Sequence, residues 1–241
     1  MSKSPAGLGS RLVIASVTLL GLVACQTSPP AAEIPPPAQA APQSPEIPAG
    51  AHEYKVNAEQ SLLQILVYRG GAMARLGHNH VIASHQLAGS VYVTDDLAQS
   101  RFDITIPVNE LTIDEPAMRE QAGADFPPGV PQGARDGTRS NMLSEALLDG
   151  VKFPAIRLRA TEVVAAGEVF DVDVEITLKD QVRHVRVPMQ VRRADGAITA
   201  SGEFPLKQSE LGLKPFSAAM GALLVVDEMR VRFDVTARDA N

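Results

Sequence analysis

The sequence predicts an all-β fold, namely a single antiparallel β-barrel of about eight strands, with one helix at about 139–149 and a long loop before it. Two observations support this prediction. Apolar and polar residues alternate with a period of two along successive stretches, as in strands that bury one face. Pairs such as Asp95-Asp96 and Asp195-Gly196, whose residue types favour turns, separate the stretches. An antiparallel barrel or sandwich buries such one-sided strands, and an eight-stranded barrel can enclose one small ligand.

Residues 1–24 have the features of an export signal. Lys3 and Arg11 precede an apolar run at 12–23, which is too short to cross a bilayer because a spanning helix needs about 20 apolar residues. The run ends in Leu-Val-Ala-Cys at 22–25, which resembles a bacterial lipobox. The resemblance implies that Cys25 is lipidated and becomes the first residue of the mature chain. Cys25 is the only cysteine, so one chain can form neither a disulfide framework nor a thiolate metal site.

Residues 25–50 are rich in Pro and Ala and predict a disordered linker. Extended at about 3.1 Å per residue, such a linker reaches up to roughly 75 Å. Gln26 follows Cys25, and by resemblance to lipoprotein sorting the absence of Asp there favours the outer membrane of a two-membrane bacterium. We therefore expect a lipid-anchored protein at the periplasmic face of the cell envelope, with its folded domain at 51–241.

The first strands of this domain are predicted at 61–69, 81–94 and 101–109. The stretch 61–69 is apolar on both faces, so we expect it to be covered on both sides. In 81–94 the alternation places Val81, Ala83, His85, Leu87, Val91 and Val93 on one face. Further alternating stretches lie at 156–159, 170–179 and 185–192.

The last two strands are predicted at 198–206 and 227–238, and they suggest a cavity. Ala200 and Gly202 are small residues on the apolar face, which would leave space there. Asp227 shares the parity of the apolar residues, so a regular strand would point its carboxylate inward. The alternative is close packing against larger neighbours, with Asp227 in the turn before the strand.

Between 113 and 153 the alternation stops. A connector as long as 114–137 is typical of a lid or binding loop. The helix expected at 139–149 has Thr138 or Ser140 as a possible N-cap, Leu143 and Leu147 on one face, and Gly150 at its end. We expect it to plug one end of the barrel.

Several segments, in the right order over about 54–236, resemble the YceI-like domain family. They are RSNML at 139–143 with FPAI at 153–156, ITLKD at 176–180 with VRVP at 185–188, FPLKQSELGL at 204–213, and VDEMRV at 226–231. The chain departs from the family pattern at Leu148, where Phe is usual, at Asp180, where Gly is usual, and in its longer segment at 113–137. The resemblance implies an extended lipocalin-like barrel that holds an isoprenoid or another long amphiphile.

The expected ligand contacts follow from the alternation and this resemblance. The two inward polar groups, His85 and Asp227, are predicted to meet a head group, and Ala200 and Gly202 to clear space. The apolar candidates are Ile104, Val172, Val174, Phe204, Val231 and Phe233. Substituting Gly202 by Leu is then expected to block the cavity and leave the fold largely intact.

Three of the five histidines lie within 78–85. His78 and His80 share a face in an extended segment, which is the geometry of a two-histidine metal site. The other interpretations are polar residues that line a cavity mouth or hold a turn, and a solvated surface. Two ligands without thiolates make an incomplete shell, so we predict no metal site and no cofactor.

The sequence contains no Gly-x-Ser-x-Gly elbow, phosphate loop or His-Glu-x-x-His motif, so we predict no enzymatic activity. The net charge is −6, and it becomes −8 when Lys3 and Arg11 leave with the signal, which argues against nucleic acid as a partner. The predicted function is that of an envelope lipoprotein that binds a long-chain isoprenoid or amphiphilic lipid. The alternatives are a metal- or haem-handling envelope protein that uses His78 and His80, and a structural or partner-binding envelope module.

Overall fold

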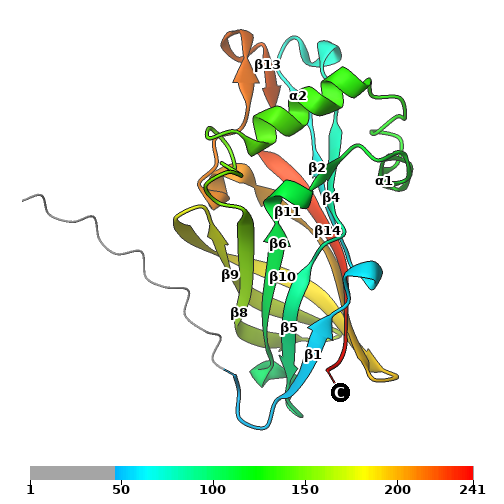
Figure 1. Ribbon diagram of the computed structural model, residues 1–241, viewed down its shortest axis with the longest axis vertical. Coiled ribbons are helices and arrows are strands. Elements are labelled where there is room, and N and C mark those ends of the chain that lie inside the picture. Colours follow the sequence, from blue (N-terminus) through cyan, green and yellow to red (C-terminus); the bar gives the residue numbers. More distant parts are fainter. Residues whose placement is uncertain (1–46, 241) are drawn as a thin grey trace, which may run out of the picture. The chain divides into compact units, whose positions relative to one another are not determined.

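The computed structural model describes residues 47–240, so the predicted signal, Cys25 and nearly all of the predicted linker lie outside the described residues. The described residues all belong to one compact unit. It contains a closed antiparallel barrel of eight strands (Figure 1), which confirms the predicted fold class. In order around the barrel, these strands are β1 (His52–Val56), β5 (Ala88–Val93), β6 (Arg101–Pro107), β8 (Ala155–Ala166), β9 (Val169–Leu178), β10 (Gln181–Ala194), β11 (Ala197–Lys207) and β14 (Glu228–Asp239).

Strand β14 closes the barrel and also extends the sheet, because its two halves pair with different strands. Its last residues pair with β1, whereas Arg230 to Asp234 pair with β2 (Leu62–Val67). Ser61 lies at the switch point, where its buried hydroxyl accepts a hydrogen bond from Thr236 N at 3.1 Å and donates to Asn57 O at 2.7 Å. Beyond β2 the sheet continues through β4 (His80–Ser84) to β7 (Thr112–Ile113).

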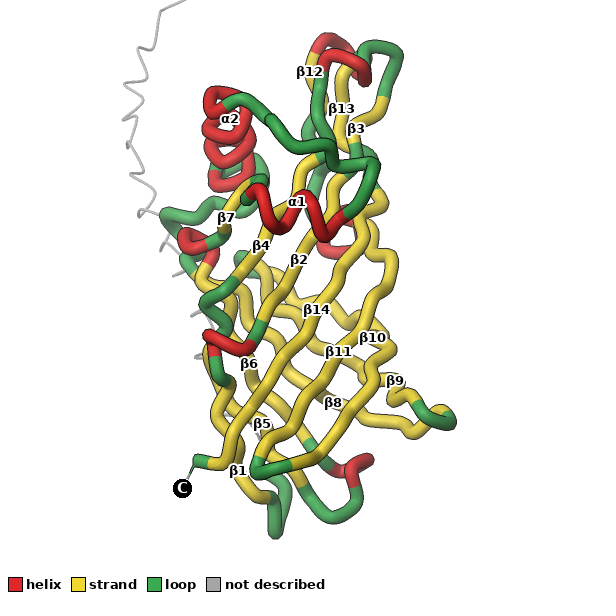
Figure 2. Tube along the Cα trace, turned by 90° about the vertical axis from the view of Figure 1, so that its right-hand side faces the viewer, coloured by secondary structure: helices red, strands yellow, loops and turns green. Residues whose placement is uncertain are grey.

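The extension is covered by the short helix α1 (Pro116–Ala122), which crosses β2 and β4 in Figure 2. Leu66, Val81 and Ala83 form a small core with Met118 of α1 and Phe126, while Leu63 and Ile65 of β2 face the barrel interior. The expectation that this apolar strand is covered on both sides is therefore confirmed. Val81 and Ala83 do not share the barrel-facing side of Leu87 and Val91, because β4 ends and a connection leads to β5, so the alternation is interrupted between them.

The second helix, α2, spans Gln132–Leu143, so the prediction of a helix at 139–149 was wrong in its bounds. Pro131 occupies the N-cap position, and Thr138 and Ser140 lie inside the helix. The helix ends where Ser144 Oγ donates a hydrogen bond to Asn141 O at 2.7 Å. The segment predicted as a long loop therefore contains α1 and the first half of α2. Neither helix is long and apolar enough to cross a membrane, among the residues that the structure describes.

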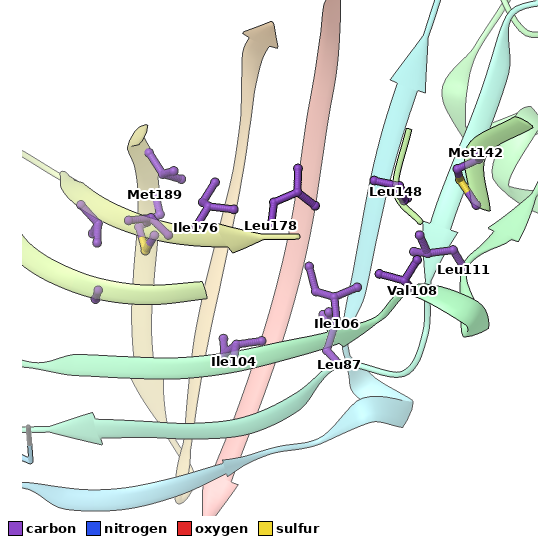
Figure 3. Close-up of a cluster of buried hydrophobic side chains, with 14 residues drawn as sticks. Leu87, Ile104, Ile106, Val108, Leu111, Met142, Leu148, Ile176, Leu178 and Met189 are labelled. Carbon is purple, nitrogen blue, oxygen red and sulfur yellow. The ribbon is translucent and has the colours of Figure 1, made fainter. Parts of the chain in front are cut away.

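The turn that follows α2 covers one end of the barrel core together with the helix, whereas we expected the helix alone to do so. Leu148 lies in this turn and belongs, with Met142 of α2, to the main core cluster. In Figure 3 these two side chains lie near Leu111 and Val108 at one end of the cluster, away from Met189. The 3-10 turn that carries Val108 is η4 (Val108–Glu110).

The remaining elements are not strands of the closed barrel. A separate three-stranded sheet consists of β3 (Arg69–Gly70), β13 (Leu223–Val225) and β12 (Ser217–Ala218). Short 3-10 turns complete the structure: η1 (Ala58–Gln60), η2 (Ala74–Leu76), η3 (Leu97–Gln99), η5 (Gln208–Leu211) and η6 (Ala219–Gly221).

Candidate ligand cavity

The barrel encloses a cavity of about 230 Å³. Its wall runs from η3, through the strands from β5 around to β14, to Leu211 of η5, and it includes Leu63 and Ile65 of β2. Apart from Ser100 and Arg101, every lining residue is Ala, Val, Leu, Ile, Met or Phe. Arg101 Nη1 is itself hydrogen-bonded to Ser100 O at 2.8 Å. Apolar cavities of this kind stay dry and accept apolar guests, as an engineered cavity of about 150 Å³ accepts benzene.

Seven of the ten predicted ligand-contacting residues line this cavity. Alternation along each strand brings them together, because every second residue of every strand points into the closed barrel. The seven are Ile104, Val172, Val174, Ala200, Phe204, Val231 and Phe233. Their contact with a ligand stays a prediction, whereas their position in the cavity wall is observed.

Gly202 does not leave space, so the interpretation of that residue was wrong. It pairs with Phe233 of β14, and a Cβ at this position would lie 2.8 Å from the Phe233 ring. The same Cβ would lie 2.5 Å from Pro188 O on the other neighbouring strand, closer than real Cβ contacts come. A leucine here must displace the backbone. The expectation that Gly202→Leu leaves the fold largely intact is therefore withdrawn.

Asp227 does not point into the barrel, and the alternative that places it in a turn is the correct one. It precedes β14, where its carboxylate accepts hydrogen bonds from Ser209 Oγ at 2.6 Å and Ser209 N at 2.9 Å. The bond from the Ser209 hydroxyl, together with that from the Ser209 backbone, lowers the pKa of Asp227 below its ordinary value. The carboxylate thus fixes η5 against the start of β14 at the surface.

His85 also lies outside the cavity wall. Strand β4 ends at Ser84, so the alternation that placed His85 with Leu87 does not continue across the connection to β5. Its side chain is 40% exposed, and Nε2 lies 3.0 Å from Glu115 Oε1. With His85 and Asp227 both outside, the described wall offers no titratable group other than Arg101 to a ligand head group.

His80, one of the three clustered histidines, belongs to a buried ionic network that the sequence pattern does not indicate. His80 Nδ1 lies 2.6 Å from Asp114 Oδ2, and Arg119 Nη1 donates to Asp114 Oδ1 at 2.5 Å. The Asp114 side chain is fully buried and that of Arg119 is 3% exposed. Burial opposes ionisation of Asp114, but hydrogen bonds from His80, the Val81 amide and Arg119 outweigh it and lower the pKa of Asp114.

The network connects three parts of the extension. Arg119 of α1 also donates to Asn79 O at 2.8 Å and to Pro127 O, and His80 Nε2 lies 3.2 Å from Thr138 Oγ1 of α2. Both ring nitrogens of His80 are thus engaged, so a metal ion could bind it only by displacing Asp114 or Thr138. Within residues 47–240, no three His, Cys, Asp or Glu side chains are grouped to hold a metal. This arrangement fits a structural role for His80.

The fold and cavity can be compared with known proteins. The crystal structure of BcnA from Burkholderia cenocepacia is similar, with a TM-score of 0.55 and 16% identity, over 76% of this chain and 99% of that one. A structure described as a polyisoprenoid binding domain from Saccharophagus degradans has a TM-score of 0.52 and 14% identity, over 77% and 98%. At these identities the likeness concerns the fold. Among curated proteins, none matches the sequence.

The family itself is shown by the sequence. The model of the YceI-like domain matches residues 54–237. This range begins within β1 and ends within β14, so it covers all or part of every strand of the closed barrel. The resemblance drawn from the short motifs is thereby confirmed. The chain belongs to the YceI-like domain family.

Proposed function

We propose that this barrel binds a long-chain isoprenoid or another amphiphilic lipid and has no catalytic role. The observation that carries the proposal is the apolar cavity of about 230 Å³, to whose wall residues 47–240 contribute no carboxylate, imidazole or thiol. The polyisoprenoid-binding description of the Saccharophagus degradans domain supports the same ligand class.

The energetics of apolar burial favour a long chain over a short metabolite. Burial contributes about 0.8 kcal/mol per methylene, and association costs at least about 4 kcal/mol. Micromolar affinity needs about 8 kcal/mol net, so roughly 15 methylenes are required. An apolar cavity of about 150 Å³ accommodates the six carbons of benzene, so by the same ratio the 230 Å³ cavity accommodates roughly nine carbons. The rest of a longer chain must displace lining side chains or lie, with its head group, at a mouth of the barrel.

A series of amphiphiles with one head group and increasing chain length tests this proposal. With delipidated protein, each added methylene is expected to tighten binding about fourfold, because 0.8 kcal/mol is gained and 1.4 kcal/mol is tenfold. The gain should stop once the chain exceeds the space available. Dissociation constants that do not depend on chain length would contradict the proposal.

We further propose that Cys25 anchors the chain at the periplasmic face of the envelope, in the outer membrane. The support is the lipobox-like sequence at 22–25 with Gln26 after it. Several acyl chains on one residue would make a stable anchor, whereas a single chain is marginal. The variant Cys25→Ser is expected to remain free of acyl groups by mass spectrometry, and an acylated mature form of this variant would refute the anchor.

A further inference from the structure

One end of the molecule carries a cluster of exposed apolar side chains. We call residues 69–77 and 212–225 the tip; they include the small sheet β3, β13 and β12, which projects beyond the barrel in Figures 1 and 2. Within residues 47–240, eight large apolar side chains are exposed, and four of them lie on the tip. They are Met73, Leu76, Phe216 and Met220, with exposed fractions of 39%, 61%, 40% and 107%.

The tip differs in charge from the rest of the chain. It contains three cations, Arg69, Arg75 and Lys214, and neither of its two segments contains Asp or Glu. The whole chain carries a net charge of −6. The tip therefore combines exposed apolar side chains with a local excess of positive charge, in a chain that is acidic as a whole.

The backbone of the tip holds Met220 outward. Ala219 and Met220 adopt φ values of 50° and 54°, a left-handed conformation that is unfavourable for residues with a Cβ. Backbone hydrogen bonds from Met73 N to Ala222 O, at 2.7 Å, and from Val225 N to Phe216 O, at 2.9 Å, fix the hairpin. Strained residues that persist in a structure often mark a functional segment.

We propose that the tip docks on an anionic lipid bilayer. Apolar side chains beside cations suit the boundary between acyl chains and negatively charged head groups, where each Lys or Arg adds attraction. The tip combines four exposed apolar side chains with three cations and has no carboxylate in either segment. An anionic bilayer offers both an apolar layer and negative charge to such a surface.

The tip is also continuous with the cavity wall. Leu211 of η5 lines the cavity and Leu213 packs against the main core, and Phe216 follows three residues later. Docking of the tip would thus place a bilayer next to one segment of the cavity wall. The docking proposal itself does not depend on lipid being bound in the barrel.

The proposal can be tested by vesicle sedimentation with residues 44–241. This part contains all four core clusters and the closed barrel, and it lacks Cys25, so an acyl anchor cannot cause binding. We expect it to sediment with vesicles of phosphatidylcholine and phosphatidylglycerol at low salt. Sedimentation should weaken at high salt and with phosphatidylcholine alone, since salt screens the attraction of exposed charges.

The variants Met220→Asp and Phe216→Asp should each lower the partition coefficient by about tenfold, because each loses apolar burial and gains an unfavourable charge. Val151→Asp is the matched control, since Val151 is 96% exposed and lies off the tip. Arg75→Gln and Lys214→Gln should each lower partition on anionic vesicles about fivefold and leave neutral vesicles unaffected. The four exposed tip residues belong to no core cluster, so thermal midpoints should stay close to that of the unsubstituted protein.

Two outcomes would overturn the proposal. The first is that residues 44–241 do not sediment with anionic vesicles at low salt. Binding of the tip to another protein would not rescue the proposal in that case. The second is an equal partition coefficient for the tip variants and Val151→Asp, which would assign the binding to another surface.

Discussion

Replacing Arg119 by methionine is expected to lower the free energy of unfolding by about 3–5 kcal/mol, because the substitution leaves a buried carboxylate without its guanidinium partner. The Asp114 side chain is fully buried, and that of Arg119 is 3% exposed. Arg119 also supplies hydrogen bonds to the carbonyl oxygens of Asn79 and Pro127, which would lose their donor. Chemical denaturation of residues 44–241 measures the effect.

Two further variants separate the charge effect from the loss of packing. Arg230→Met is the matched control, because it breaks an ion pair with Glu203 whose side chains are 49% and 41% exposed. Its cost should stay below about 1 kcal/mol, as for other surface pairs. Adding Asp114→Asn to Arg119→Met should recover part of the loss, since the unpaired buried charge is removed. Equal costs for Arg119→Met and Arg230→Met would show that the buried network is not a principal source of stability.

The lowered pKa of Asp114 gives this network a defined pH dependence. A carboxyl group whose pKa is lower in the folded state than in the unfolded state stabilises the fold above the unfolded value. That contribution is lost as the pH falls from the ordinary range of aspartate toward the lowered folded value. Asp114→Asn should therefore lose less stability over this acidic interval than the unsubstituted protein does.

Replacing Ala200 by phenylalanine is expected to weaken binding of a long-chain amphiphile at least a hundredfold. Ala200 lines the cavity between Val191 and Val235, its partners on the two neighbouring strands. One added ring is about the size of benzene and takes up roughly two thirds of the 230 Å³. Excluding about six carbons removes nearly 5 kcal/mol of burial at about 0.8 kcal/mol each. The dissociation constant is measured with the longest amphiphile that the unsubstituted protein binds well.

The cavity should accommodate the added phenylalanine ring, so the stability of Ala200→Phe is expected to remain nearly unchanged. Ala194→Phe serves as the control, because Ala194 is exposed on β10 and does not line the cavity. It adds the same ring to the protein outside the barrel and should bind the amphiphile normally. Equal dissociation constants for the two variants would place the binding site elsewhere.

Much of the cavity could be predicted because strand alternation is a local property. Val231 lies between two arginines and Phe204 follows Glu203, so their inward direction follows from the period of two. The same rule failed at His85 and Asp227 because each lies just beyond a strand end, after Ser84 and before Glu228. Beyond a strand end, successive side chains no longer point to opposite faces, so an odd or even position in the sequence does not predict the direction of a side chain.

Other features depend on contacts between distant segments. From the sequence, Gly202 suggests an unfilled position in the barrel. Its pairing with Phe233 shows that the Phe233 ring fills that position. The pattern of Leu143 and Leu147 suggested a helix, but a turn after α2 brings Leu147 to the core as well. The ionic network of Asp114 joins β4 to α1 and α2, and the spacing of its residues in the sequence does not predict it.

Native mass spectrometry of the folded protein, purified without detergent, tests the central claim most directly. We expect a co-purified amphiphile of roughly 15 or more methylenes, or an isoprenoid of similar length, that leaves on denaturation. We also expect Ala200→Phe to lack this ligand and Ala194→Phe to retain it. A folded, ligand-free protein that also fails to take up any long-chain amphiphile when these are supplied would contradict the account and favour a structural or partner-binding module.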